Sequence, residues 1–376
     1  MLLTLIFLTS LLMVVFTIPP IINLALRKRL FDKPGEFRKV HKRLVPNFGG
    51  IAIFTAFLFT SSLFVQPALL PEGNALMAAG SILFMIGLND DIVELGPLKK
   101  FFVQFASALI IAVVADIRIT SLYGTIGIHE LSYVASVIIT MVSIVGVVNA
   151  FNLIDGIDGL AASLGVCVSL TYAYLFWNAG LPGWSYLSIA LTGSLVGFLF
   201  FNVSPARIFM GDSGSLLLGF IAVVLSIKLM NVVGSGHVKF GAIELTSGVG
   251  FVLAVLIIPV FDTIRVFSLR ILRGRSPFVA DSNHLHHRLL FLGLSHMQST
   301  LILAVVNIMF IVMAVTLQNL GNTGLVGLIF LTVLTANGLL SLYIERFKKA
   351  ILNRANAAPV ILEGFNDKML DKIIEN

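Results

Sequence analysis

The segment NAFNLIDGIDGL, residues 149–160, places two aspartates and two asparagines beside two glycines. In helical geometry Asp155 and Asp158 share a face, with Asn152 one turn earlier. Carboxylate and amide oxygens suit Mg²⁺, which fills its other positions with water and substrate phosphate. The glycines would let a ligand or a backbone approach closely. The alternative interpretation, a helix N-cap followed by turn glycines, needs only one of these acids.

A second acidic group occurs in LNDDIVELGPLKKFFVQF, residues 88–105. Asp90 and Asp91 precede Lys100, which shares a helix face with Gln104 at i,i+4. Two carboxylates near a cation can hold a divalent metal or accept a proton from a phosphate or hydroxyl. The same pair could instead simply end a helix in water.

GDSGS at 211–215 opens an apolar stretch. Backbone N–H groups at a helix N-terminus favour phosphate, and Asp212 could bind a metal that bridges it. A helix cap alone would also explain this sequence.

Two further segments carry basic and imidazole groups. HLHH at 284–287 follows Arg273 and Arg275, which are suited to clamp a diphosphate, although a cytoplasmic loop would carry arginines in any case. Because no second set of zinc-like ligands accompanies the histidines, we favour hydrogen bonding to an anionic or sugar substrate. The other segment, DKPGEFRKVHKR at 32–43, contributes Lys39 and His41.

The elements that position these residues are predicted to be membrane helices. Of the 376 residues, 57% are hydrophobic and 12% charged, which excludes an ordinary soluble domain. Apolar windows long enough to cross a bilayer recur along the chain. We predict an all-α polytopic protein with about 11 transmembrane helices, near 2–26, 48–66, 75–89, 101–117, 131–149, 160–177, 185–202, 214–231, 245–270, 298–317 and 324–343.

The basic residues predict the orientation. With the N-terminus outside, 22 of the 25 Lys and Arg residues fall on inside segments, as the positive-inside rule requires. The sequence pI of 9.5 therefore reflects topology and not nucleic-acid binding. All five polar segments then meet at the cytoplasmic face, and the C-terminus is cytoplasmic. The outside loops show nothing comparable.

Several local features follow from the same pattern. The first window lacks a basic n-region and is expected to be a retained span. Span 9 should be kinked at Pro259, where Asp262 and Arg265 can pair at i,i+3, unless Arg265 snorkels to the interface. Residues 117–130 could form a small hairpin. We predict a transmembrane catalytic domain at 1–343 and a cytoplasmic basic tail at 344–376, helical from Glu345 and lying on the inner surface.

Taken in order, DD with K-x-x-x-Q, then N-x-x-N-x-x-D-G-x-D-G-L, F-M-G-D-x-G-S and H-x-H-H resemble the polyprenyl-phosphate N-acetylhexosamine-1-phosphate transferases, the superfamily of WecA, TagO and MraY. The match runs from about Lys39 to Arg288. The loop NHLHHRL is similar to the WecA/TagO branch, because the MraY branch typically shows an all-histidine loop. The acidic motif DDIVE departs from the form with a third nearby aspartate, so Glu94 is not a secure replacement for it.

The resemblance implies the reaction. A polyprenyl (undecaprenyl) phosphate attacks the β-phosphorus of a UDP-N-acetylhexosamine, expected to be UDP-GlcNAc, and UMP leaves. The product starts lipid-linked cell-envelope glycan synthesis at the cytoplasmic face of the plasma (inner) membrane. A homodimer is expected by the same analogy.

The resemblance also implies roles for individual residues. Asp90 would position or deprotonate the acceptor phosphate, with Asp91 and Lys100 beside it. Asn152 and Asp212 would hold Mg²⁺, or alternatively Mn²⁺. The expected substrate-binding residues are Lys39, His41, Asn149, Asp155, Asp158, Arg265, Arg273, Arg275, His284, His286 and His287.

Two rival functions stay open. Within the enzyme class, the donor could be the muramoyl-pentapeptide nucleotide. Outside it, a membrane transporter would also carry intramembrane acids and kinked helices, but transporters tend to place polar sites near the midplane and to show repeats. This sequence shows no repeat.

Overall fold

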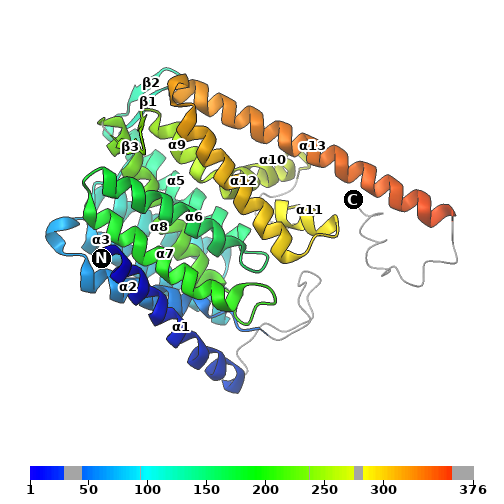
Figure 1. The fold of residues 1–376 in the computed structure, drawn as a ribbon, viewed down its shortest axis with the longest axis horizontal. Helices are drawn as coiled ribbons and strands as arrows, with labels where there is room; N and C mark the ends of the chain where they lie inside the picture. The colour runs from blue at the N-terminus through cyan, green and yellow to red at the C-terminus, as the bar shows by residue number, and fades with distance from the viewer. Residues whose placement is uncertain (29–44, 94, 237, 275–282, 358–376) are drawn as a thin grey trace.

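The computed structural model describes residues 1–28, 45–93, 95–236, 238–274 and 283–357. It is a helical bundle with two short hairpins (Figure 1). The helices are α1 Leu2–Lys28, α2 Gly49–Phe64, α3 Gly73–Val93, α4 Pro97–Leu109, α5 Tyr133–Ile154, α6 Leu160–Asn178, α7 Pro182–Asn202, α8 Gly211–Gly234, α9 Gly248–Val255, α10 Ile257–Leu272, α11 Leu285–Phe291, α12 His296–Thr316 and α13 Gly321–Ala357. The short turns are η1 Pro67–Leu69, η2 Ile110–Val114 and η3 Gln318–Leu320, and the strands are β1 Ser121–Thr125, β2 Ile128–Glu130, β3 Val238–Phe240 and β4 Ile243–Leu245.

The helices fit a polytopic membrane protein. In the described part of the chain, nine helical stretches are long and apolar enough to cross a membrane, and the bent pair α9–α10 would make ten. Each of the eleven predicted windows overlaps a helix, but α2 has only 16 residues. The all-α polytopic class is confirmed, while the count of eleven and the orientation stay predictions.

Helix α8 forms the centre of the bundle. In its most apolar stretch 83% of the residues are buried, against 22% in that of α1 and 17% in that of the helical stretch Gln318–Ile351. Neighbouring helices approach it through glycines: a Cβ at Gly50 would lie 2.2 Å from Gly214 N, and one at Gly87 would lie 2.6 Å from Ser213 Cα. Small residues at such crossings allow close backbone packing. The N-terminus of α8 is thereby fixed against α2 and α3.

The predicted kink in span 9 is confirmed, but it precedes the proline. Helices α9 and α10 meet at 79° around Leu256, three residues before Pro259. Proline cannot donate a hydrogen bond to the carbonyl four residues earlier. Asn307 on α12 donates its Nδ2 to that carbonyl, Val255 O, at 3.2 Å. The break is therefore held open by a side chain from another helix.

The end of the bundle opposite α11 carries the two hairpins (Figure 1). The hairpin expected at 117–130 is confirmed as β1–β2, and β3–β4 is a second antiparallel pair that the sequence analysis missed. Gln318 Oε1 accepts the N–H groups of Thr246 and Ser247 at 2.8 and 2.7 Å. Asn322 Oδ1 accepts Val249 N at 3.0 Å, so these amides cap the start of α9.

The C-terminal helix differs from the expected span followed by a separate surface helix. Helix α13 is continuous over 37 residues to Ala357, and nothing in it breaks at 343/344. Figure 1 shows it starting beside the hairpins, passing α11 and projecting beyond the other helices. The domain boundary and the surface location of the tail stay predictions.

Candidate active site

The catalytic residues proposed from sequence meet at the end of the bundle that carries α11. Lys100, in the first turn of α4, forms an ion pair with Asp90 from the last turn of α3. The same Nζ lies 2.8 Å from Asp212 Oδ2 at the start of α8. Asp90 Oδ1 also accepts Leu95 N at 2.6 Å. One lysine therefore bridges two carboxylates that are far apart in sequence.

Asn152 joins this cluster from the last turn of α5. Its Nδ2 donates to Asp212 Oδ1 at 2.9 Å and to Ser215 Oγ at 3.0 Å. Asn152 also lines the cavity described below. The proposed metal ligands Asn152 and Asp212 are thus in direct contact.

Asp91 contacts the backbone of α8. Its Oδ1 accepts Asp212 N at 2.7 Å, and its Oδ2 accepts Ser213 N at 3.0 Å and Ser213 Oγ at 2.7 Å. A carboxylate is a favourable partner for the N–H groups at a helix N-terminus. These two N–H groups are therefore occupied in this structure, and a substrate phosphate at this helix N-terminus stays a prediction. A role of Asp91 in catalysis stays a prediction.

Asp155 and Asp158 do not share a helix face, contrary to the expectation. Helix α5 ends at Ile154, and α6 begins after Gly159, which has φ +77°. Glycine adopts a positive φ readily, whereas this backbone conformation is unfavourable for other residues. Both acids consequently lie in a turn between the helices.

Asp158 is buried and bonds away from the acidic cluster. Its Oδ2 accepts Ala206 N at 3.1 Å, and its Oδ1 lies 3.3 Å from His296 Nδ1 at the start of α12. Thr300 donates to its carbonyl oxygen at 2.9 Å. These contacts fix the turn to two other elements. The predicted contact with the nucleotide stays a prediction.

The histidine loop is anchored on α10. Asp262, 1% exposed, accepts Leu285 N at 3.0 Å and lies 2.8 Å from His284 Nδ1. Arg265 Nη2 donates to Asp262 Oδ1 at 2.9 Å and also to the Asn283 carbonyl. The i,i+3 pairing of Asp262 and Arg265 is confirmed over snorkelling. Arg265 and His284 thus hold the loop in place.

His286 packs against the turn that follows α5. A Cβ at Gly156 would lie 2.2 Å from His286 Nε2, so any larger residue there would displace the imidazole. His286 is 1% exposed and its Nδ1 has no hydrogen-bond partner among the described residues. Burial lowers its pKa to about 3, and the neighbouring His287 acts in the same direction. His286 is therefore neutral at pH 7.

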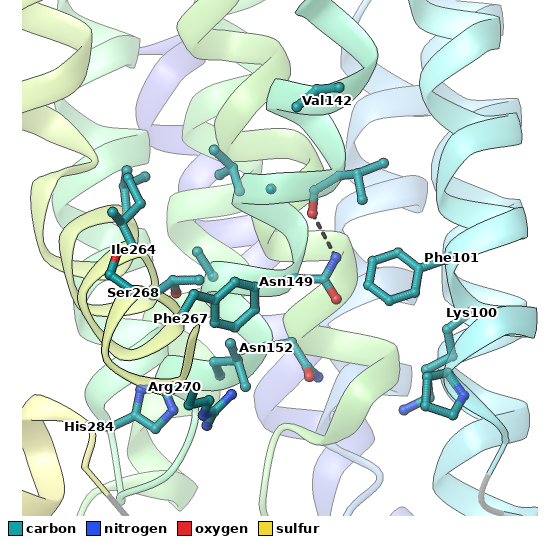
Figure 2. Close-up of a pocket in the computed structure, with 18 of the residues that line it drawn as sticks. Lys100, Phe101, Val142, Asn149, Asn152, Ile264, Phe267, Ser268, Arg270 and His284 are labelled. Carbon is teal, nitrogen blue, oxygen red and sulfur yellow. Dashed lines mark hydrogen bonds between the residues drawn. The ribbon is translucent and has the colours of Figure 1, made fainter. Parts of the chain in front are cut away.

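A cavity of about 870 Å³ lies between α4, α5 and α10 and ends at the histidine loop. Figure 2 shows Lys100, Asn152, Arg270 and His284 around its polar end, with Phe101 and Phe267 facing each other farther along. The walls beyond are apolar; they include Phe105, Val142, Val145, Val260 and Ile264. Val142 is 58% exposed and Ile264 is 50% exposed. The apolar end of the cavity therefore opens to the outside of the bundle.

Asn149 lines the middle of this cavity. Its Nδ2 donates to Gln104 Oε1 and to Val145 O, both at 2.7 Å, and Gln104 is 1% exposed. The dashed line in Figure 2 marks the second of these bonds. The orientation of the Asn149 amide is thus set by the i,i+4 partner of Lys100.

The oxygen donors suit a hard cation. Within the described residues no group of three or more His, Cys, Asp or Glu side chains is arranged to hold a metal. Mg²⁺, however, usually takes only one or two carboxylates and completes its shell with water and substrate phosphate. Burial raises the pKa of Asp155 to about 7, and the charge of Asp212 acts in the same direction. Excess negative charge beside Asp212 and Asn152 fits a divalent cation.

Among the described residues, Arg273 does not line the cavity. Arg273 ends α10 and is exposed. Lys39, His41, Arg275 and Glu94 lie outside the described residues. The sequence analysis missed Arg270, which is 4% exposed and lines the polar end. The signal was its spacing, because Thr263, Phe267 and Arg270 follow a helical period and all line the cavity.

Comparisons with known proteins place this geometry in context. The glycosyl transferase family 4 profile matches residues 74–230. A probable undecaprenyl-phosphate N-acetylglucosaminyl 1-phosphate transferase of Bacillus subtilis strain 168 is 32% identical, over 83% of this chain and 84% of that protein. A decaprenyl-phosphate N-acetylglucosaminephosphotransferase of Mycobacterium tuberculosis H37Rv is 34% identical, over 80% and 79%. An undecaprenyl-phosphate alpha-N-acetylglucosaminyl 1-phosphate transferase of Escherichia coli K12 is 27% identical, over 72% and 71%.

Proposed function

The chain belongs to the polyprenyl-phosphate N-acetylglucosamine-1-phosphate transferases of glycosyl transferase family 4, and from that premise we propose that it transfers N-acetylglucosamine 1-phosphate from UDP-N-acetylglucosamine to a polyprenyl phosphate. A phosphate oxygen of the lipid forms a new bond to the β-phosphorus. The bond between that phosphorus and the bridging oxygen breaks, and UMP leaves with the oxygen. The product is a lipid diphosphate that carries the sugar.

The observation that carries this proposal is the two-ended cavity. Its apolar walls open to the outside of the bundle, and its polar end abuts Lys100 and Asn152. A ligand with an isoprenoid chain and a phosphate head matches both ends: the chain would lie along the apolar walls, and the phosphate would lie at the polar end. Undecaprenyl phosphate is the acceptor we propose.

Lys100 and Asp90 act on the acceptor phosphate. Lys100 reaches the cavity while its Nζ is held by Asp90 and by Asp212. An ammonium group beside the incoming phosphate offsets the repulsion between two anionic reactants, which is the main requirement of phosphoryl transfer. Asp90 fixes the lysine and is the candidate base, although a phosphate is already mostly ionised at pH 7.

We further propose Mg²⁺ as the cofactor, with Mn²⁺ as an alternative, held by Asp212 and Asn152. When bound there, the cation would neutralise charge on the diphosphate. Asp155 adds negative charge to the same corner and helps to place the nucleotide. Because Asn152 now donates to Asp212, its amide would have to present its oxygen to a cation.

The donor's sugar and diphosphate are assigned to the other polar groups of the cavity. Arg270, His286 and His287 line it from α10 and α11. Guanidinium groups bind phosphate oxygens with two parallel hydrogen bonds. A neutral His286 can offer either a donor or an acceptor to a sugar hydroxyl or amide.

We propose that this end of the bundle faces the cytoplasm in the plasma membrane. Three basic residues, Arg118, Lys228 and Lys239, are the exceptions to the inside count, and they lie near the hairpin end. The remaining 22 basic residues are on the segments predicted from the sequence to be inside. This distribution is what the positive-inside rule favours. The homodimer stays a prediction.

The test follows the phosphorus. Purified protein is given undecaprenyl phosphate, Mg²⁺ and UDP-N-acetylglucosamine labelled at the β-phosphate. We expect the label in the lipid product, and EDTA should abolish the transfer. Sugar in the lipid with the label left on UDP would overturn the mechanism. Transfer only from the N-acetylgalactosamine or the muramoyl-pentapeptide nucleotide would replace the proposed donor.

A further inference from the structure

The seven-residue helix α11 has two faces with different contacts. One face presents His286 to Gly156, and His287 lines the cavity. Arg288 follows two positions after His286, about 200° around the helix, and therefore points to the opposite side. What holds α11 from behind determines where the two histidines lie.

Helix α13 supplies that support. Arg288 donates from Nη1 to Asn337 Oδ1 at 2.5 Å and from Nη2 to Ser341 Oγ at 2.7 Å. Asn337 and Ser341 are one turn apart on α13, so the planar guanidinium spans them as a fork. Ser341 also donates to the Asn337 carbonyl at 2.9 Å, which fixes its hydroxyl.

A second contact lies one turn farther along α11. The ring of Phe291 meets Phe347 edge-on, with centroids 6.2 Å apart, and Lys348 Nζ lies 5.6 Å from the Phe291 centroid. Both partners belong to the part of α13 that runs past α11 (Figure 1). Helix α13 thus contacts α11 at both Arg288 and Phe291.

Helix α10 provides a further anchor, because Asp262 accepts Leu285 N at the start of α11 and Arg265 donates to the Asn283 carbonyl. The loop before α11 is therefore fixed to α10, while the body of the helix is fixed to α13. Burial lowers the pKa of Arg288 to about 10, so the guanidinium stays charged at pH 7 and its hydrogen bonds are charge-assisted.

We propose that Arg288 is a positioning residue for the donor: by holding α11 on Asn337 and Ser341 of α13, it sets His286 and His287 against the polar end of the cavity. The proposal rests on the proposed function, because it assigns the donor's sugar and diphosphate to those histidines. It also gives α13 a part in the reaction, although none of its described side chains lines the cavity.

Steady-state kinetics of Arg288→Met test the proposal. We expect the KM for UDP-N-acetylglucosamine to rise about tenfold, equivalent to ~1.4 kcal/mol, with the KM for undecaprenyl phosphate unchanged. A purely structural role would only lower the folded fraction, which reduces the apparent kcat and leaves both KM values alone. That pattern would overturn the proposal.

Variants of α13 test the same contact without replacing Arg288, so the result does not depend on how well Arg288→Met folds. Asn337→Leu should raise the donor KM in the same way, and combining it with Arg288→Met should add little, because both remove one contact. Arg288→Lys should recover part of the donor affinity. Thr335→Val is the matched control: Thr335 is an exposed residue of α13 that bonds only within its own helix in the described structure, and it should change neither KM.

Amide hydrogen exchange gives a readout that needs no turnover. Exchange across α11 should become about tenfold faster in Arg288→Met and Asn337→Leu, because local opening costs less free energy. Unchanged exchange, or faster exchange with an unchanged donor KM, would overturn the proposal. If the wild-type protein transferred sugar phosphate from no donor, the proposed function would be wrong. The exchange result would still decide whether Arg288 holds α11.

Discussion

The two ends of the bundle both carry buried polar groups, yet they differ in kind. At the hairpin end the polar groups near α9 are neutral amides, such as Gln318 and Asn322, each matched to backbone N–H groups. At the site end they are carboxylates: Asp90 and Asp212 share the ammonium of Lys100. Asp155 lies close enough to Asp212 for that charge to raise its pKa. The first arrangement is complete, whereas the second carries surplus negative charge.

The difference separates support from chemistry. A neutral hydrogen-bonded cap satisfies the unpaired backbone groups at a helix end and needs no further ligand. Uncompensated carboxylates beside an open cavity are unfavourable for the fold alone and favourable for a cation and a phosphate. Polarity by itself therefore does not mark the active site; unbalanced charge next to a cavity does.

The largest expected effect comes from the site end. Asp212→Asn keeps the side chain's shape but removes its charge. Turnover should fall by about 10²–10³-fold, the loss that follows when other enzymes lose one group that stabilises the transition state. UMP release by the purified variant measures it. Asp116→Asn at the hairpin end is the matched control, since Asp116 is an exposed acid paired with Arg118. Equal losses in the two variants would erase the contrast between the ends.

Lys100→Met should come next. It leaves two carboxylates without their shared cation, so turnover should fall about 100-fold and stability by about 1–3 kcal/mol. Lys99→Met is the control, because Lys99 is adjacent and exposed. Activity assays and thermal unfolding in detergent measure both quantities. A variant as active as the wild type would remove Lys100 from the site.

Gln318→Leu probes the other end. Thr246 N and Ser247 N lose their acceptor, and stability should fall by about 2 kcal/mol. The protein that remains folded should keep its kcat and both KM values. Thermal unfolding and kinetics on the same sample separate the two effects. A changed KM would show that the hairpin end takes part in substrate binding.

The smallest effect concerns pH. Burial lowers the pKa of His286 to about 3, below its ordinary value of 6.5. Between these values the unfolded chain binds a proton that the folded chain excludes, so stability falls as pH drops below 6.5, by up to ~1.4 kcal/mol per pH unit. His286→Gln should flatten this slope between pH 6.5 and 5.5. The exposed His129 of β2 provides the control, His129→Gln; equal slopes in all three proteins would contradict the burial account.

The sequence was sufficient for features that depend on local pattern. Apolar runs located the helices, and the i,i+3 spacing found the pairing of Asp262 with Arg265. The predicted topology placed Asp90, Lys100, Asn152 and Asp212 at the same membrane face, and the structure shows them in contact.

What the sequence missed depends on partners far along the chain. The cap that Asp91 forms on α8 needs α3 and α8 to pack through Gly87, which no local pattern reveals. Asp155 and Asp158 were expected on a helix, but the backbone turns at Gly159. The continuity of α13 was missed because its composition changes from apolar to basic within one helix.

One measurement tests the central claim most directly: the identity of the nucleotide that the purified wild-type protein releases from UDP-N-acetylglucosamine, with undecaprenyl phosphate and Mg²⁺ each omitted in turn. The account predicts UMP, and only when both are present. Release of UDP would mean that the sugar moves without its phosphate. Release of no nucleotide from this donor, its N-acetylgalactosamine epimer or the muramoyl-pentapeptide nucleotide would contradict the assignment of the charged end as a site of sugar-phosphate transfer.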